Sequence, residues 1–293
     1  MKVEGAGELD LLTRIMPYLA TEGFAITAGE DDTAAWSDHG SYTVASCDMA
    51  VEGVHFDLSW MTAEDAGWRA LALALGDLAA KGATPSWALT SVAVPRTWQV
   101  EDFVGLYRGM DALAKTTGAL IVGGDMSSID GPAVISITVV GRTVTLPLAR
   151  SKARPGWAVA VTGPLGAAAV ALKAHRPLRL VPLLEEGRRL NQAGLCCGDV
   201  SDGLLREMEK FAHASHAGCV IRAADIPLAG GATWEEALTS GEESELVCVG
   251  PEEVIRRVGL RPLGVLTEDP AIRVVGADDL PLQFHLSGYD HFA

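Results

Sequence analysis

The first half of the chain alternates between helix-like and strand-like hydrophobic patterns. Apolar residues recur at helical spacing from Leu9 to Leu19, which predicts an opening helix that ends near residues 17–22. A second helix is predicted to begin after Thr62, where the sequence has a capping pattern, and to end at Gly82. The remaining elements of this half are predicted as a helix at 101–117 and strands at 41–49, 87–95, 119–125 and 133–141.

The second half repeats the pattern after a break. Residues 146–157 contain prolines and basic residues without periodicity, which indicates a linker or an exposed crossing. The order strand, glycine turn, helix then occurs in 158–174 and again in 194–215, and a further strand and helix are predicted in 243–259. We therefore expect an α/β protein with an N-terminal domain of residues 1–148 and a C-terminal domain of residues 149–293. The strand order does not follow from the pattern.

Length and composition agree with two folded domains in a reducing compartment. The chain has 293 residues, 48% of them hydrophobic, which suffices for two cores. The five cysteines show no C-x-x-C spacing, which favours reduced core residues over a zinc site. The acidic N-terminus lacks the layout of a signal peptide, and no apolar run approaches the ~20 residues that span a bilayer. We expect a cytoplasmic protein that does not interact with membranes.

The charge balance limits the partners of the protein. The formal net charge is −15, from 38 acidic and 23 basic residues, and no basic stripe is present. This balance argues against nucleic acid as a partner. A nucleotide ligand stays compatible with it, because divalent cations placed between carboxylates and phosphates remove the repulsion.

Aspartates recur at the ends of predicted elements, among small or apolar neighbours. Each has an ordinary explanation as a helix cap, a turn residue or part of a solvated loop. Asp77 fits these least well, because its helix is otherwise rich in alanine and leucine and an unpaired buried carboxylate is unfavourable. Its partner would be Arg69, Lys81 or a metal ion. One shared site explains the whole set better than separate roles; the set is Asp31, Asp32, Asp48, Asp77, Asp125, Asp199 and Asp202.

The residue types indicate the chemistry of such a site. Oxygen ligands without histidine or cysteine partners suit hard cations, and Mg²⁺ commonly combines carboxylates with substrate phosphates. Several aspartates therefore predict several Mg²⁺ ions and a polyphosphate substrate. The chain has neither a P-loop nor a G-x-G-x-x-G fingerprint. The segment Gly123-Gly124-Asp125 is predicted to be a two-glycine turn that presents a carboxylate directly after a strand.

Several segments, in their order along the chain, resemble the thiamine-monophosphate kinase family. They are "GEDDTAAW", "CDMAVEGVHF", "ALGDLAAKGATP", "GGDMSS", "ARSKARPGW", "VTGPLG", "DVSDGLL", "SGEESEL" and the tail "GYDHF". The family belongs to a superfamily with aminoimidazole ribonucleotide synthetase and selenophosphate synthetase. The resemblance implies a two-domain PurM-like fold, with an N-terminal sheet that pairs across a homodimer and a C-terminal α/β domain.

The resemblance also implies an activity: ATP-dependent phosphorylation of thiamine phosphate to thiamine diphosphate, by direct in-line transfer assisted by several Mg²⁺ ions. The implied ATP contacts are Gly124, Asp125, Arg150 and Ser201, and the implied thiamine phosphate contacts are His55, Glu242 and Tyr289. The implied metal ligands are Asp31 or Asp32, Ser46, Cys47 through its backbone, Asp48, Asp77, Asp125, Asp199 and Asp202. The spacing leaves open which of Asp31 and Asp32 is the ligand, and no residue is identified as a certain catalytic base.

The chain departs from the family pattern at a few positions. Cys47 stands where the family has threonine, Ser244 where it has tyrosine, and "ALGD" where it has "NLSD". Most carboxylates are kept, so phosphoryl transfer is better supported than the identity of the acceptor. The alternative is a related ATP-dependent kinase or synthetase that acts on another small substrate. A non-catalytic module that binds metal and nucleotide is the alternative from a different class.

Overall fold

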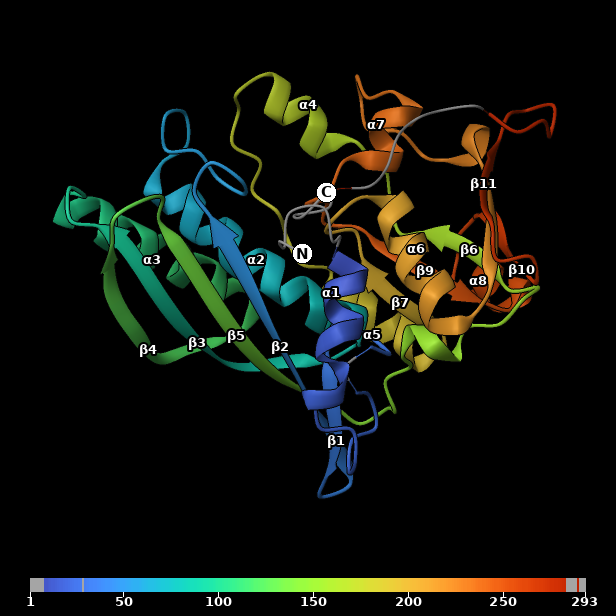
Figure 1. Ribbon diagram of the computed structural model, residues 1–293, viewed down its shortest axis with the longest axis horizontal. Helices are drawn as coiled ribbons and strands as arrows, with labels where there is room; N and C mark the ends of the chain where they lie inside the picture. The colour runs from blue at the N-terminus through green and yellow to red at the C-terminus, as the bar shows by residue number, and fades with distance from the viewer. Residues whose placement is uncertain (1–7, 28, 283–288, 290–293) are drawn as a thin grey trace.

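The computed structural model describes residues 8–27, 29–282 and 289. It consists of two β-sheets with helices packed against them, one on either side of the molecule in Figure 1. The chain begins with α1 (Glu8–Ile15) and the 3-10 turn η1 (Met16–Tyr18), where the helical spacing predicted an opening helix. The first sheet is formed between residues 34 and 143 and the second between 158 and 275, so the predicted boundary near residue 148 falls between them. The division into domains there stays a prediction.

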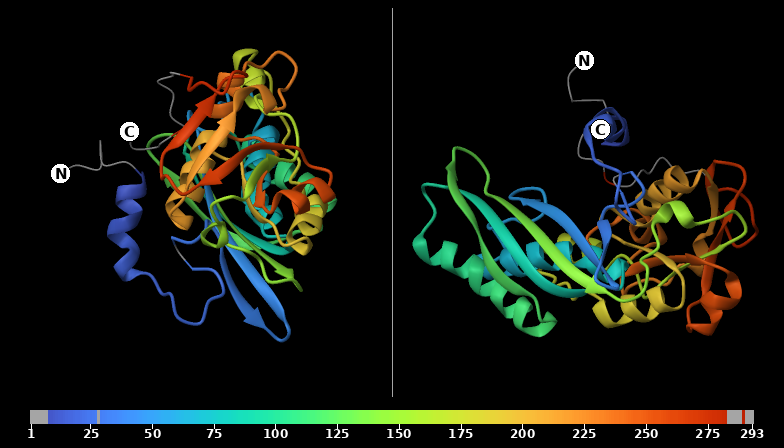
Figure 2. Two further views of the ribbon diagram at one scale, coloured as in Figure 1. Left: turned by 90° about the vertical axis from the view of Figure 1, so that its right-hand side faces the viewer. Right: turned by 90° about the horizontal axis from the view of Figure 1, so that it is seen from below.

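The first sheet has five strands in the order β1-β2-β5-β3-β4, and only β3 and β4 are parallel. Helices α2 and α3 both lie on one face of it, as Figure 2 shows. The α2 helix begins with a capping box in which Thr62 and Asp65 exchange hydrogen bonds, as the sequence pattern predicted. The bounds are β1 Ala34–Asp38, β2 Ser41–Val51, α2 Ala63–Ala80, β3 Thr84–Pro95, α3 Val100–Thr117, β4 Leu120–Ile129 and β5 Val134–Thr143.

The opposite face of this sheet carries exposed apolar side chains. Residues on each strand alternate, so that Ala88 and Val92 of β3 are buried under the helices whereas Trp87 and Leu89 are exposed. Met49 of β2 lies on the same outer face and is 53% exposed. A face of this kind on a soluble protein usually marks an interaction surface.

The predicted turn at Gly123-Gly124-Asp125 is wrong, because these residues lie inside β4. They pair in register with Leu89, Thr90 and Ser91 of β3, and the strand continues to Ile129. A Cβ atom on Gly124 would lie 1.7 Å from the carbonyl oxygen of Thr90. Gly124 is therefore required for the close approach of two strands, a reason that the sequence does not distinguish from a turn.

The second sheet has six strands in the order β11-β8-β10-β6-β9-β7, and only β11 and β8 are parallel. Its core contains Phe211 and Met208 of α6 packed on strand residues such as Val247 and Val249. Its strands are β6 Ala158–Val161, β7 Cys196–Asp199, β8 Gly218–Arg222, β9 Leu246–Gly250, β10 Pro262–Thr267 and β11 Ile272–Val275. Its helical elements are η2 Arg150–Lys152, α4 Ala167–Lys173, α5 Leu184–Gln192, α6 Leu204–Ser215, η3 Ala223–Asp225, α7 Trp234–Thr239 and α8 Glu252–Arg257.

Helix α2 joins the two halves of the molecule. Ala79 and Ala80 at its C-terminal end share a buried cluster with Leu190 of α5 and Cys197 of β7. A Cβ atom on Gly187 of α5 would lie 1.8 Å from the carbonyl oxygen of Ala79, so the two helices touch at backbone distance there. This contact places the end of α2 beside the end of β7. Within the described residues, no helix has the length and apolar character to span a membrane.

Candidate active site

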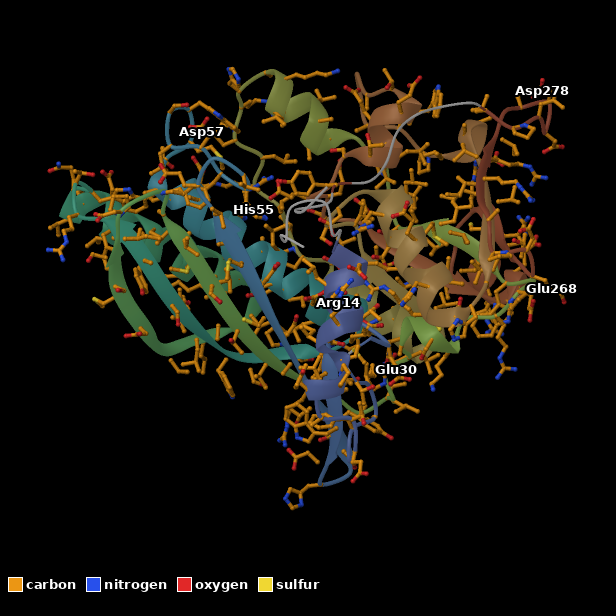
Figure 3. The ribbon with its side chains drawn as sticks, viewed as in Figure 1. Arg14, Glu30, His55, Asp57, Glu268 and Asp278 are labelled. Carbon is orange, nitrogen blue, oxygen red and sulfur yellow. The ribbon has the colours of Figure 1, made fainter. Side chains whose placement is uncertain are left out.

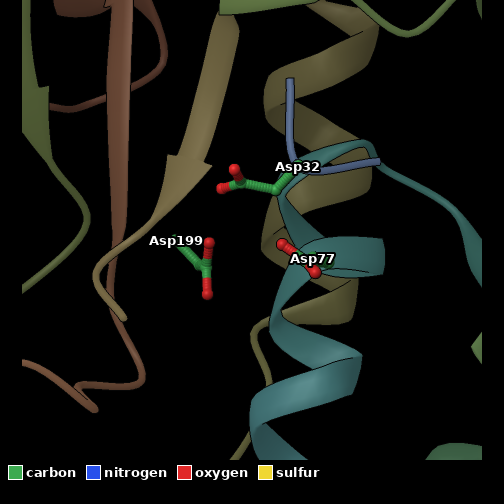
Figure 4. A group of neighbouring side chains, drawn as sticks. All are labelled: Asp32, Asp77 and Asp199. Atoms are coloured by element: carbon green, nitrogen blue, oxygen red, sulfur yellow. The ribbon is translucent and has the colours of Figure 1, made fainter. Parts of the chain in front are cut away.

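Three carboxylates from distant parts of the chain meet where α2 approaches β7. Asp32 comes from the loop before β1, Asp77 from the last turns of α2, and Asp199 from the end of β7 (Figure 4). One carboxylate oxygen of each residue lies within 4.8 Å of one oxygen of each of the other two. Gly76 makes room for this arrangement, because a Cβ atom there would already lie 3.2 Å from Asp199 Oδ2.

The electrostatics of the cluster favour the arrival of a cation. Burial and the neighbouring charges of Asp199 and Asp32 raise the pKa of Asp77 well above its usual value. Burial, followed by the charge of Asp199, raises the pKa of Asp48 to about 6. Asp199 is 7% exposed, and its buried Oδ1 atom has no hydrogen-bond partner among the described residues. Crowded carboxylates with an unpartnered buried oxygen are the donor set that hard divalent cations select, so the residues fit Mg²⁺.

Asp31 and Asp32 are neighbours in sequence but have different partners. The Asp31 side chain is 1% exposed, and its Oδ2 accepts hydrogen bonds from Lys81 Nζ at 2.6 Å and from the Arg150 backbone N–H at 3.0 Å. Its Oδ1 accepts from the Arg150 guanidinium at 3.0 Å. The Asp31 carboxylate is thus engaged by Lys81 and Arg150, whereas Asp32 pairs with Arg150 at 2.6 Å and also faces Asp77 and Asp199. Of the two positions that the sequence left open, only Asp32 lies in the cluster.

Arg150 was predicted to lie in a linker and to contact ATP. It is 2% exposed, and its guanidinium binds Asp31, Asp32 and Glu207 with N–O distances between 2.6 and 3.1 Å. The carboxylates of Asp31 and Asp32, acting against the effect of burial, raise the pKa of Arg150 well above its usual value. In this structure the guanidinium organises carboxylates and makes three ion pairs. Its predicted contact with ATP stays a prediction.

Asp202 and Lys210 extend the cluster toward a cavity. Lys210 of α6 places its Nζ 3.1 Å from Asp202 Oδ2 and 3.5 Å from Asp32 Oδ2. Burial alone would lower the pKa of Lys210, but Asp32 and other carboxylates raise it above its ordinary value. Asp202 and the predicted ATP contact Ser201 both line the cavity. The loop that joins β7 to α6 therefore connects the carboxylates to a ligand-sized space.

The predicted metal ligands on strand β2 lie on opposite faces of the first sheet, because successive side chains of a strand alternate. The side chains of Ser46 and Asp48 point to the face that α2 covers, and the Ser46 hydroxyl donates a hydrogen bond to Asp77. Cys47 is exposed on the opposite face, where its thiol lies 3.5 Å from the Ser136 hydroxyl. Ser46 and Asp48 thus adjoin the cluster, whereas Cys47 could contribute only its backbone, as the resemblance implied.

Asp125 lies apart from the other carboxylates. It is exposed on β4 and aligns through Ser91 and Ser136 with Met49 of β2. Three strand spacings of about 4.8 Å separate it from β2, or about 14 Å along the sheet. Its side chain is also on the outer face, opposite to that of Asp48. Within one copy of the chain, the structure does not bring Asp125 into the cluster.

The three residues predicted to bind thiamine phosphate meet at one cavity of about 460 Å³ between the two halves of the molecule. His55 lies on the loop between β2 and α2, where its Nδ1 accepts a hydrogen bond from the Val51 backbone (Figure 3). Glu242 adopts a left-handed backbone conformation with φ +56°, and Tyr289 is 48% exposed. The rest of the "GYDHF" tail lies outside the described residues. Ser244, where the chain departs from the family, is not among the described residues that line this cavity.

A partly buried ion pair between Arg69 and Glu242 forms part of the cavity wall. Arg69 of α2 is bonded to Glu242 and also donates to the backbone carbonyl of His55 at 2.8 Å. Burial lowers the pKa of Arg69 to about 10. Oε1 of Glu242 is buried and receives no hydrogen bond from the part of the chain that the structure describes. Sequence reasoning named Arg69 and Lys81 only as partners for Asp77, but they pair with Glu242 and Asp31.

Sequence reasoning missed Glu207 and Lys210. Both follow the "SDGLL" segment on α6, where the apolar residues Leu204, Met208 and Phe211 are buried. Glu207 shares this apolar face, and an acidic residue at a core position is a signal for a buried partner. Trp60, which stacks on His175 in the cavity wall, was also missed. An isolated tryptophan in a loop gives no comparable signal in the sequence.

Comparisons with known proteins agree with the geometry. The family model "AIR synthase related protein, N-terminal domain" matches residues 29–143. The thiamine-monophosphate kinase of Bacillus subtilis is 31% identical, over 97% of this chain and 99% of the relative. That of Methanopyrus kandleri is 32% identical, over 92% of each chain. The solved structure "AaThiL complexed with AMPPCP and TMP" is similar with a TM-score of 0.87 at 25% identity, covering 100% of this chain and 99% of that chain.

Proposed function

Because the chain belongs to the thiamine-monophosphate kinase family, we propose that it transfers the terminal phosphoryl group of ATP to thiamine phosphate, forming thiamine diphosphate. The observation that carries this proposal is the adjacency of two sites. A carboxylate cluster suited to metal-bound phosphates continues, through Asp202, into a cavity that the predicted thiamine phosphate residues line. The solved structure "AaThiL complexed with AMPPCP and TMP" has the same fold over the whole chain.

We assign the metal-binding role to Asp32, Asp77 and Asp199, with Asp48 and Asp202 beside them. Asp31 is assigned instead to holding Lys81 and Arg150, because all of its close contacts are with these two residues and its own backbone neighbour. Mg²⁺, when bound, would neutralise the carboxylates and the phosphates of both substrates and hold the phosphates in line. Asp199 supplies the clearest donor for such an ion, since no described residue gives its buried Oδ1 a hydrogen bond.

The cavity suits a flat cationic ring that carries a phosphate. The Glu242 carboxylate and the rings of Trp60 and Tyr289 face it, and a positively charged thiazolium gains from both kinds of contact. Arg69 fixes the Glu242 side chain and adds positive charge on the side of α2. The phosphate end of the acceptor then points toward Asp202 and the carboxylate cluster.

The acceptor needs no general base. The attacking oxygen of thiamine phosphate is already anionic, so no proton has to be removed before it attacks the ATP γ-phosphorus. The protein has to place the phosphates of thiamine phosphate and ATP in line and to exclude water. In this arrangement Asp202 and Ser201 mark the junction at which acceptor and donor meet.

A second copy of the chain would give Asp125 a role. Met49, Trp87, Leu89 and Leu120 form an exposed apolar face on the first sheet, and Asp125 lies on this face at the edge opposite to β2. If two such faces pack together about a twofold axis parallel to the strands, β4 of one copy lies toward β2 of the other. We propose a homodimer in which Asp125 and Gly124 approach the nucleotide bound at the other copy.

The direct test is product formation by the purified full chain. Incubation with ATP, Mg²⁺ and thiamine phosphate should give equal amounts of ADP and thiamine diphosphate, measured by chromatography, and none in excess chelator. A folded protein that binds ATP but forms no thiamine diphosphate would reject this acceptor. ATP turnover stimulated by a different small substrate would then support the related kinase or synthetase. Sedimentation of the wild type against Leu89→Asp tests the dimer separately.

A further inference from the structure

A lysine ammonium lies between two of the carboxylates that we assign to the metal centre. Lys210 Nζ is 3.1 Å from Asp202 Oδ2 and 3.5 Å from Asp32 Oδ2. Asp202 and Lys210 belong to the second half of the molecule, whereas Asp32 precedes β1 in the first half. The ammonium therefore bridges the two halves at a position where a divalent ion could also bridge two carboxylates.

The surroundings distinguish Lys210 from an ordinary surface ion pair. Its side chain is 17% exposed, whereas that of Lys115, which pairs with Asp111 on α3, is 74% exposed. Exposed pairs of the second kind contribute little and exchange readily with solvent ions. A lysine held by two carboxylates and shielded from water is a fixed part of the charge distribution.

Lys210 offsets part of the negative charge of the metal-binding carboxylates. In the count of formal charges, Lys81 and Arg150 offset the buried Asp31 and Glu207, and Arg150 also contacts Asp32. The remaining charges are five carboxylates and Lys210; the carboxylates are Asp32, Asp48, Asp77, Asp199 and Asp202. Lys210 thus reduces five formal negative charges to four, the charge that two divalent ions neutralise.

We propose that Lys210 is a built-in monovalent cation that takes the position of a divalent ion between Asp32 and Asp202. The chain consequently loads fewer metal ions than its carboxylates could hold. It also keeps Asp32 and Asp202 together before any ion or nucleotide arrives. Lys210 is a positioning residue, since it acts through these two side chains. The inference rests on the proposed function, because it assumes that the carboxylates bind metal.

Metal stoichiometry tests the proposal without any measurement of turnover. Mn²⁺ binding is counted by electron paramagnetic resonance for the wild type, Lys210→Gln and Lys210→Arg, with Lys115→Gln as the matched control. Lys210→Gln should bind one additional Mn²⁺ per chain, whereas the other variants should match the wild type. An unchanged or smaller count in Lys210→Gln would overturn the proposal.

Two further measurements keep the test decisive if Lys210→Gln folds poorly without metal. Its melting temperature in chelator should fall below that of the wild type, and added Mg²⁺ should raise it by a larger increment. In wild-type crystals soaked with Mn²⁺, anomalous density should be missing between Asp32 and Asp202. An ion bonded to both carboxylates, with Lys210 displaced, would refute the proposal. These outcomes leave the kinase activity untouched, since thiamine diphosphate formation tests that separately.

Discussion

Replacing Asp31 by asparagine tests whether Asp31 and Asp32, which the sequence alone does not distinguish, have different roles. The Asp31 side chain is 1% exposed and accepts from Lys81 at 2.6 Å and from the Arg150 guanidinium at 3.0 Å. Asp31→Asn keeps the shape but leaves both buried cations short of a counter-charge. Removing one partner from a buried pair costs about 3–5 kcal/mol. Asp32→Asn removes a 36% exposed carboxylate that pairs with buried Arg150 at 2.6 Å, but it also relieves the repulsion with Asp77 and Asp199, so we expect a smaller loss of about 1–2 kcal/mol.

Equilibrium unfolding in urea, followed by tryptophan fluorescence in chelator, measures both effects. With a slope of about 3 kcal/mol per M, Asp31→Asn should lower the midpoint by about 1 M or more. Saturating Mg²⁺ at about 100 times its dissociation constant adds about 2.7 kcal/mol to a chain that binds it. Asp31→Asn should retain this increment and Asp32→Asn should lose most of it. The reverse result, a stable Asp31→Asn that no longer responds to Mg²⁺, would make Asp31 the ligand and refute the reasoning.

Three further predictions concern other parts of the site. Burial raises the pKa of Asp48 to about 6 in the folded, metal-free chain, above the unfolded value of about 4, so ionising this residue lowers stability as pH rises from about 4 to 6. Thermal melts in chelator should show a flatter pH dependence for Asp48→Asn over this range, and an unchanged slope would contradict the assignment. Glu242→Gln should raise the KM for thiamine phosphate about tenfold or more and change the KM for ATP little, because the variant loses both the ion pair with Arg69 and a negative charge that faces the acceptor. Equal effects on the KM of both substrates in steady-state assays would exclude a role in acceptor binding. Gly124→Ala places a methyl group 1.7 Å from the Thr90 carbonyl oxygen, so urea unfolding should show a loss of stability of more than about 2 kcal/mol. Wild-type stability would mean that β3 and β4 can move apart to accommodate the methyl group.

Most secondary structure followed from the sequence because its signals are local. The capping pattern at Thr62 and the periodicity of 101–117 specify α2 and α3 almost to the residue. β1, α5, β8, α7 and β10 were missed, because each is only five to nine residues long, too short for its pattern to stand out from the flanking loops. Strand order is set by contacts between distant segments, which no local pattern encodes. The glycine pair before Asp125 was mistaken for a turn because close strand packing and tight turns both require glycine.

The candidate site was predictable in its residue types and less so in its geometry. A resemblance across many short motifs identified Asp32, Asp77 and Asp199, and the fold brings these together. It could not separate Asp31 from Asp32, because the difference lies in which cations their side chains reach. Nor could it place Lys210, whose role depends on the meeting of α6 with the loop before β1.

The attachment of Tyr289 has a consequence for how its substitutions are interpreted. Its backbone N–H donates to the carbonyl oxygen of Asp202 at 3.2 Å, so this residue is fastened to the one that links cavity and carboxylates. A substitution that shifts the backbone at Tyr289 therefore disturbs the metal side of the site as well as the acceptor side. Loss of acceptor affinity in such a variant reports on the aromatic ring only when divalent-ion binding is unchanged, and Tyr289→Phe, which keeps the ring, is the matching comparison.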